Sequence, residues 1–214
     1  ISVAVCVGEK TKEKMKSKLL EKTEKLNVGP YTDEKADFGP LNNKAHYEKV
    51  LGYIDNGEKE GAKLVADGRN FKLQGYESGY FVGPTIFEDV KPNMKIYKEE
   101  IFGPVLSMMT TKTYDEALNL VNEHELGNGA AVFTRSGNIA KHFTENAKIG
   151  MIGVNVPIPV PVAYHSFGGW KRSLFGDHSI HGPDGVRFYT KLKTATVTWV
   201  EDNAGPEFTI PVLS

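Results

Sequence analysis

The spacing of apolar residues changes repeatedly along the chain and predicts strands that alternate with helices. Residues 1–8 form a β-branched apolar run, which is typical of a buried strand. Residues 11–26 carry a narrow apolar stripe among lysines, so an amphipathic helix is expected there. A second helix is predicted from about Asn42, a good N-cap, to residues 56–57, and a short strand follows at 62–66.

The same alternation continues through the second half of the chain. Strands are predicted at 80–87, 105–110, 129–134 and 150–156, and helices at 113–122 and 136–147. Pro84 interrupts the first of these strands and favours an edge or bulge position, because proline cannot donate a ladder hydrogen bond. Strands separated by helices require crossover connections. The predicted fold class is therefore α/β, with a largely parallel sheet covered by helices.

The pattern changes beyond residue 156. Prolines alternate with apolar residues at 157–161, so this stretch is expected to be an extended loop that serves as a linker or a pocket wall. Residues 188–200 are rich in threonine, valine and aromatic residues and predict one more strand. An unpaired strand of that length is an aggregation hazard unless a partner covers it. The chain is thus expected to divide into a domain at 1–187 and a C-terminal strand with its tail at 188–214.

Composition narrows the classes of partner. The 214 residues include 26 Lys and Arg against 27 Asp and Glu, a formal net charge of -1. This balance argues against a nucleic acid or an anionic membrane as partner. No apolar run approaches the roughly 18 residues that a membrane span needs. The single cysteine, Cys6, rules out an internal disulfide framework and makes a reducing compartment the default.

The candidate chemistry is concentrated at residues 98–105, which read Lys-Glu-Glu-Ile-Phe-Gly-Pro-Val. Glu99 and Glu100 lie beside Phe102 and a Gly-Pro corner, directly before a predicted buried strand. A bare Glu–Glu pair is most often a solvated acidic turn, because charge pairs are mostly surface features. The residues around the pair favour a binding site at a strand edge instead.

This segment resembles the E-E-x-F-G-P-V signature of the aldehyde dehydrogenase superfamily. The resemblance implies that Glu100 holds the ribose hydroxyls next to the nicotinamide of NAD and that Phe102 lies against the nicotinamide ring. An ionised carboxylate suits the ribose, since it accepts two hydroxyl hydrogen bonds and charge-assisted bonds are the stronger kind.

Three further stretches match the family in the same order, at 79–85, 126–134 and 166–173. Each is weak alone, but four in sequence are specific, and the resemblance extends to about Val200. Residues 155–161, 165–171 and 173–177 resemble the branch of the family that acylates coenzyme A. That branch oxidises methylmalonate or malonate semialdehyde to propanoyl-CoA or acetyl-CoA through a Cys thioester, with loss of CO2. Residues 173–177 depart from the S-G-x-G-R-E that many relatives carry.

The resemblance also places the nucleophile. The catalytic Cys of the family aligns upstream of Ile1, so the chain is expected to be a C-terminal fragment that lacks its nucleophile and is inactive alone. Cys6 is expected to be a buried small hydrophobe with a raised pKa. Two alternatives stay open: an aldehyde dehydrogenase that forms the free acid, and a non-catalytic module for binding or assembly.

Other candidate contacts follow from the family. His46 and Lys49 share a face of the second helix. The family uses this helix near the adenosine ribose, so both are candidate cofactor residues, although two solvated side chains are an equal alternative.

The substrate pocket and the histidines complete the candidate site. The resemblance implies that Phe167 lies at the mouth of the substrate tunnel, with a core residue as the alternative. Asn155 is expected to orient the pocket loop or to bond the next turn. His165, His178 and His181 lack the spacing of a metal site, so no metal is predicted.

The resemblance further implies how the protein assembles and where it acts. In the family the strand that corresponds to residues 188–200 lies in a sheet between subunits. A homodimer, or dimers paired into a tetramer, is therefore expected, with Trp199 in the contact. The expected location is the mitochondrial matrix in a eukaryote and the cytoplasm otherwise.

Overall fold

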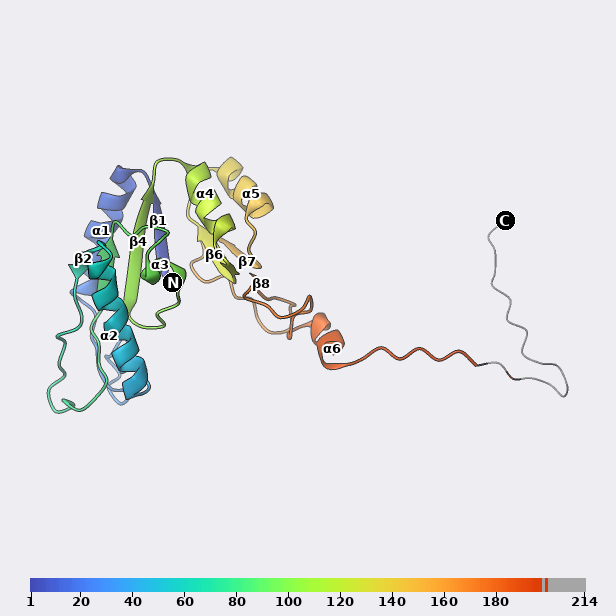
Figure 1. The fold of residues 1–214 in the computed structure, drawn as a ribbon, viewed down its shortest axis with the longest axis horizontal. Helices are drawn as coiled ribbons and strands as arrows, with labels where there is room; N and C mark the ends of the chain where they lie inside the picture. Colours follow the sequence, from blue (N-terminus) through green and yellow to red (C-terminus); the bar gives the residue numbers. More distant parts are fainter. Residues whose placement is uncertain (198, 200–214) are drawn as a thin grey trace.

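Four strands form the main sheet of the computed structural model, which describes residues 1–197 and 199 (Figure 1). Their order across the sheet is β1 (Val3–Val7), β4 (Val105–Thr111), β3 (Thr85–Glu88) and β2 (Lys63–Ala66). The pairs β1–β4 and β4–β3 are parallel, whereas β2 pairs antiparallel with β3. The prediction of an α/β fold with a largely parallel sheet is confirmed.

Helices cover both faces of this sheet because its strands are apolar on both sides. On one face Cys6, Ile86 and Met108 form a cluster with leucines of α1 (Glu9–Thr23). The other face is covered by α2 (Lys44–Lys59) and α3 (Lys95–Lys98). Neighbouring residues of one strand, such as Ile86 and Phe87, belong to opposite clusters, as the period of two in a strand requires.

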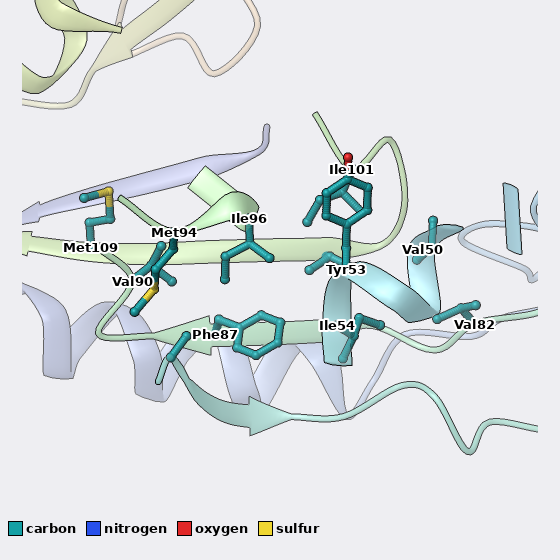
Figure 2. Packing of buried hydrophobic residues seen from close by; sticks show 12 residues of the cluster. Val50, Tyr53, Ile54, Val82, Phe87, Val90, Met94, Ile96, Ile101 and Met109 are labelled. Carbon is teal, nitrogen blue, oxygen red and sulfur yellow. The ribbon is translucent and has the colours of Figure 1, made fainter. Parts of the chain in front are cut away.

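The larger core lies between α2, α3 and the sheet (Figure 2). Phe87 and Ile54 have no exposed surface, and Ile96 is 2% exposed. Full burial of a side chain of this size contributes about 1.5–3 kcal/mol. The core therefore fixes α2 firmly on the sheet.

A second lobe lies beside the main sheet (Figure 1) and contains the remaining elements up to residue 171. They are α4 (Tyr114–Glu123), β5 (Leu126–Gly127), β6 (Gly129–Val132), α5 (Gly137–Asn146), β7 (Met151–Val154) and β8 (Trp170–Lys171). The strands β6 and β7 are parallel, and β5 pairs antiparallel with β8. Leu118 of α4 and Phe143 of α5 are central to the buried cluster of this lobe.

Helix caps agree closely with the sequence-based expectations. The side chains of Thr113 and Ser136 accept hydrogen bonds at the starts of α4 and α5, and both are the first residues of the helices predicted at 113–122 and 136–147. The cap of α2 is Asn43, one residue later than expected, and its Oδ1 accepts from the backbone N–H of His46 at 2.8 Å.

Two expectations are wrong. Of the two positions expected for the strand with Pro84, an edge or a bulge, the edge is wrong: β3 lies between β4 and β2, and Pro84 comes just before its first residue, where no ladder hydrogen bond is lost. The β2–β3 pair does contain a register shift, between Leu64 and Ala66 of β2. A helix, α6 (Pro183–Tyr189), replaces the start of the predicted terminal strand, so Phe188 and Tyr189 are helical. Pro183 at its first turn, after Gly182 with φ +66°, is a favourable helix start.

The predicted boundary at residue 188 therefore falls inside a helix. Residues 190–197 form no strand and pair with no other strand among the described residues. Beyond them, residues 198 and 200–214 lie outside the described part of the chain. Pairing between subunits stays a prediction.

Two glycines of α2 give a matched test of this packing. A Cβ on Gly57 would lie 2.9 Å from Cζ of Phe87, whereas a Cβ on Gly52 meets nothing within 4 Å. Gly57→Ala is expected to lower the free energy of unfolding by about 1–3 kcal/mol through overpacking. Gly52→Ala should raise it by about 0.5–1 kcal/mol through helix propensity. Urea denaturation measures both, and equal effects would contradict the packing at Phe87.

Candidate cofactor-binding site

The loop at residues 99–103 connects α3 to β4 and turns successive side chains in opposite directions. Ile101 is 6% exposed and belongs to the large core, whereas Glu100 and Phe102 are exposed. The carboxylate of Glu100 takes part in no hydrogen bond or ion pair with any described residue. The loop is therefore anchored by an apolar residue and presents a carboxylate and an aromatic ring to the outside.

Phe102 has an unusual backbone conformation. Its φ is +58°, in the left-handed region that a bulky residue rarely adopts, and its side chain is 74% exposed. Such strain costs of the order of 1–3 kcal/mol and persists where the surrounding structure enforces it. Gly103 next to it lies against α2, where an added Cβ would come within 2.9 Å of Cγ2 of Val50.

Helix α2 brings His46 to this loop. The His46 ring lies 6.4 Å from the Phe102 ring between centroids, in a tilted arrangement. Its Nδ1 is 2.9 Å from Oδ1 of Asn42, which orients the imidazole. His46 and Phe102 are 56 positions apart in the sequence, and the fold brings their rings together.

Lys49 lies one turn further along the same helix. Its Nζ is 5.5 Å from the centre of the Tyr53 ring, and Nζ of Lys95 is 5.2 Å from the same ring. These residues, together with Gly52 and Asn56, line an open cavity of about 330 Å³. The predicted cofactor residues are therefore all on α2 and on the loop packed against it.

These residues fit a nicotinamide cofactor. Glu100 offers an exposed carboxylate that can accept hydrogen bonds from ribose hydroxyls. Phe102 offers an exposed ring whose backbone is held by the burial of Ile101 and the contact of Gly103 with Val50, so an aromatic ligand can pack against it.

The two predicted substrate residues lie in the second lobe. Asn155 follows β7 with φ +57°, and its amide bonds both the N–H and the C=O of Thr134, at 2.9 and 3.1 Å. It therefore fixes the start of the proline-rich loop. Phe167 is half-buried and stacks on His181 with ring centroids 4.8 Å apart. The structure shows no aromatic contact or hydrogen bond between these two and Glu100 or Phe102 among the described residues.

Sequence reasoning missed Lys171, which holds the loop at residues 166–173 to α4. It has φ +55°, and burial lowers the pKa of its ammonium group. The ammonium donates to three carbonyl oxygens at the C-terminal end of α4, those of Val121, Asn122 and His124, at 3.0, 3.1 and 2.9 Å. A cation at that end of a helix is favourable. A lysine in a turn gives no sequence signal for such a contact.

Sequence reasoning also missed Tyr53 and its hydrogen bond to Glu99. Tyr53 is at a helical spacing typical of a core residue, and it is 7% exposed. Its hydroxyl donates a hydrogen bond of 2.5 Å to Oε2 of Glu99. Burial, followed by the nearby Glu99, raises the pKa of Tyr53 to about 12.

The cysteine lies in the core and has no direct role at this site. Cys6 is 1% exposed, and burial raises the pKa of its thiol, which confirms the expectation of a buried small hydrophobe. Within residues 1–197 and 199, no group of three or more His, Cys, Asp or Glu side chains could hold a metal ion. No helix in the same part of the chain is both long and apolar enough to cross a bilayer.

Comparison with known proteins decides the family. The sequence model of the aldehyde dehydrogenase family matches residues 2–195. This chain belongs to the aldehyde dehydrogenase family. The strands and helices described above are thus a portion of the aldehyde dehydrogenase fold.

Similar proteins have related names. Malonate-semialdehyde dehydrogenase of Pseudomonas aeruginosa is 50% identical over 215 residues, which is 100% of this chain and 43% of that protein. The acylating mitochondrial methylmalonate-semialdehyde/malonate-semialdehyde dehydrogenase of Bos taurus is 46% identical over 95% of this chain and 38% of its own length. The chain therefore spans about two fifths of the length of these curated relatives.

Solved structures in the family have the same fold. A Sinorhizobium meliloti protein, provisionally assigned as methylmalonate-semialdehyde dehydrogenase and complexed with NAD, superposes with a TM-score of 0.89 at 55% identity. The match covers 95% of this chain and 41% of that one. Methylmalonate-semialdehyde dehydrogenase from Oceanimonas doudoroffii has a TM-score of 0.89 at 52% identity, over 94% of this chain and 41% of its own.

The strain at Phe102 generates a prediction for the intact protein. Phe102→Gly should raise the free energy of unfolding by about 1 kcal/mol, because glycine adopts φ +58° at no steric cost. The same change should weaken NAD binding, since the exposed ring is lost. Phe102→Leu is the control that keeps the strain but removes the ring. Urea denaturation and NAD titration measure the two effects, and a loss of stability in Phe102→Gly would contradict the argument.

Proposed function

We propose that the intact protein to which this chain belongs is an NAD-dependent aldehyde dehydrogenase that oxidises methylmalonate or malonate semialdehyde. The observation that carries the proposal is the pair of exposed side chains, Glu100 and Phe102, held in place by a strained loop on α2. The names of the relatives support the substrate class, and the NAD complex of the Sinorhizobium protein supports the cofactor.

The candidate cofactor residues of this chain have different proposed roles. The Glu100 carboxylate accepts hydrogen bonds from the ribose next to the nicotinamide and so fixes the ring position. Phe102 packs against the nicotinamide ring, and His46, close to Phe102, limits its movement. Lys49 contacts the cofactor from the neighbouring turn of α2. When bound, NAD supplies the acceptor for the hydride that leaves the substrate.

The second lobe supplies the proposed substrate pocket. Asn155 orients the proline-rich loop through its two bonds to Thr134, and Phe167 packs against the acyl group of the aldehyde. Lys171 keeps the loop at residues 166–173 at the end of α4. These residues exclude water and position the substrate, whereas the attacking thiol is expected upstream of Ile1.

Coenzyme A is the proposed acyl acceptor, and the thioester product is propanoyl-CoA or acetyl-CoA, with release of CO2. The bovine relative is named as acylating, which supports this choice. Water as acceptor, giving the free acid, is the second candidate. The proposed location is the mitochondrial matrix in a eukaryote and the cytoplasm otherwise; the bovine relative is named as mitochondrial, which supports the first.

The test is product analysis with the intact protein, methylmalonate semialdehyde and NAD, with and without coenzyme A. Propanoyl-CoA, CO2 and NADH are expected in equal amounts when coenzyme A is present. Free acid as the main product would favour the second candidate. No NADH under either condition would favour a non-catalytic module.

Glu100→Gln in the same assay should slow hydride transfer by about tenfold or more, because the amide keeps the shape but loses the charge on two hydrogen bonds. Glu145→Gln, an exposed glutamate paired with Lys141 in the second lobe, is the matched control and should leave the rate unchanged. Single-turnover NADH formation is the measurement, and an unaltered rate in Glu100→Gln would show that Glu100 is a surface carboxylate.

Assembly as a homo-oligomer is also proposed. The residues after α6 expose large apolar side chains, with Leu192 96% and Trp199 90% exposed. Exposed apolar surface of this kind is typical of an interaction site. Pairing with the same segment of a second copy, in a dimer or in a tetramer built from two dimers, would cover it.

Deletion of the residues after Tyr189 from the intact protein should dissociate or aggregate it. Light scattering measures the mass. Leu192→Ser/Trp199→Ser in the full chain is a milder variant with the same expected direction. Retention of the original mass by both variants would contradict this mode of assembly.

A further inference from the structure

One hydrogen bond ties the site loop to α2 through side chains. The Tyr53 hydroxyl donates to Oε2 of Glu99 over 2.5 Å, and 46 positions separate the two residues. Hydrogen bonds to an ionised oxygen are short and about twice as strong as neutral ones. Glu99 is the residue directly before Glu100. A side chain of α2 is thus bonded to the loop immediately next to the proposed ribose ligand.

The ring of the same tyrosine lies between two lysines. Lys49 and Lys95 have their ammonium groups 5.5 and 5.2 Å from its centre, within the range of a cation–π contact. Nζ of Lys95 is also 3.8 Å from Oε2 of Glu99. Tyr53 therefore contacts Lys49, a proposed cofactor residue, through its ring. Its hydroxyl contacts Glu99, the neighbour of Glu100.

The loop needs such a contact to have a defined orientation. Ile101 and Gly103 anchor it by packing, which is not directional. Glu100 and Phe102 have exposed side chains, so where they point depends mainly on the backbone of the loop, with the His46 ring as a neighbour of Phe102. Among the described residues, the Tyr53–Glu99 bond is the side-chain hydrogen bond that reaches this loop.

We propose that Tyr53 is a positioning residue, which acts through Glu99 to hold Glu100 and Phe102 in their binding orientation before the cofactor arrives. The identity of that cofactor rests on the proposed function, whereas the order of the loop does not. Preorganisation of this kind reduces the cost of binding, because less conformational freedom is lost when the ligand binds.

The test compares variants of the intact protein. Tyr53→Phe removes the hydroxyl but keeps the ring between the lysines, and Glu99→Ala removes the acceptor. Glu99→Gln keeps a carbonyl oxygen that can accept from the tyrosine. Tyr114→Phe is the matched control, since the Tyr114 hydroxyl also bonds a side chain, Nδ1 of His142 at 2.9 Å, in the second lobe.

Two measurements are made on each variant. The Glu99 N–H donates to the carbonyl of Lys95 at 2.9 Å, and its protection against hydrogen exchange, without cofactor, should fall about tenfold in Tyr53→Phe and in Glu99→Ala. The Kd for NAD should rise several-fold in both. The double variant Tyr53→Phe/Glu99→Ala should be no worse than either single variant, because the two groups act as one unit. Glu99→Gln should recover most of the loss.

The contrary results are equally definite. Additive effects of Tyr53→Phe and Glu99→Ala, or protection of the Glu99 amide no lower than in Tyr114→Phe, would overturn the proposal. A lower melting temperature alone, shared with Tyr114→Phe, would mean a merely structural hydroxyl. A wild type that fails to bind NAD would count against the proposed function, and the exchange measurement would still decide the role of Tyr53.

Discussion

The packing of α2 on the sheet at Phe87 is the contact on which the rest of the structure depends. Phe87 has no exposed surface, and Gly57 of α2 lies so close to its ring that a methyl group would not fit. Dense packing of this kind leaves a helix little freedom to slide or rotate. The position of every side chain on the outer face of α2 follows from it, including His46 and Lys49.

The candidate site is a consequence of the same packing. The loop at 99–103 lies on α2 through the contact of Gly103 with Val50, and its central residue, Ile101, is part of the same core as Phe87. Apolar burial thus supplies the free energy that keeps Phe102 in a strained backbone conformation. Stability in the core and exposure at the site are linked, because one loop contributes to both.

The second lobe depends on polar contacts more than on a large core. Its buried cluster is small, whereas Lys171 bonds three carbonyl groups at the end of α4 and the amide of Asn155 bonds both backbone groups of Thr134. Such bonds are directional, so they suit loops that must present a pocket. The two lobes therefore place binding residues by different means.

The sequence by itself determined the alternation of strands and helices, the starts of two helices at Thr113 and Ser136, the burial of Cys6 and the motif around Glu100. These features depend on residues a few positions apart, and periodicity and capping act over that range. The tertiary structure alone decided that β3 is an inner strand, that residues 183–189 are helical, and that Tyr53 meets Glu99. The reason is physical: strand order and a hydrogen bond across 46 positions depend on how distant elements pack, which local preference does not specify.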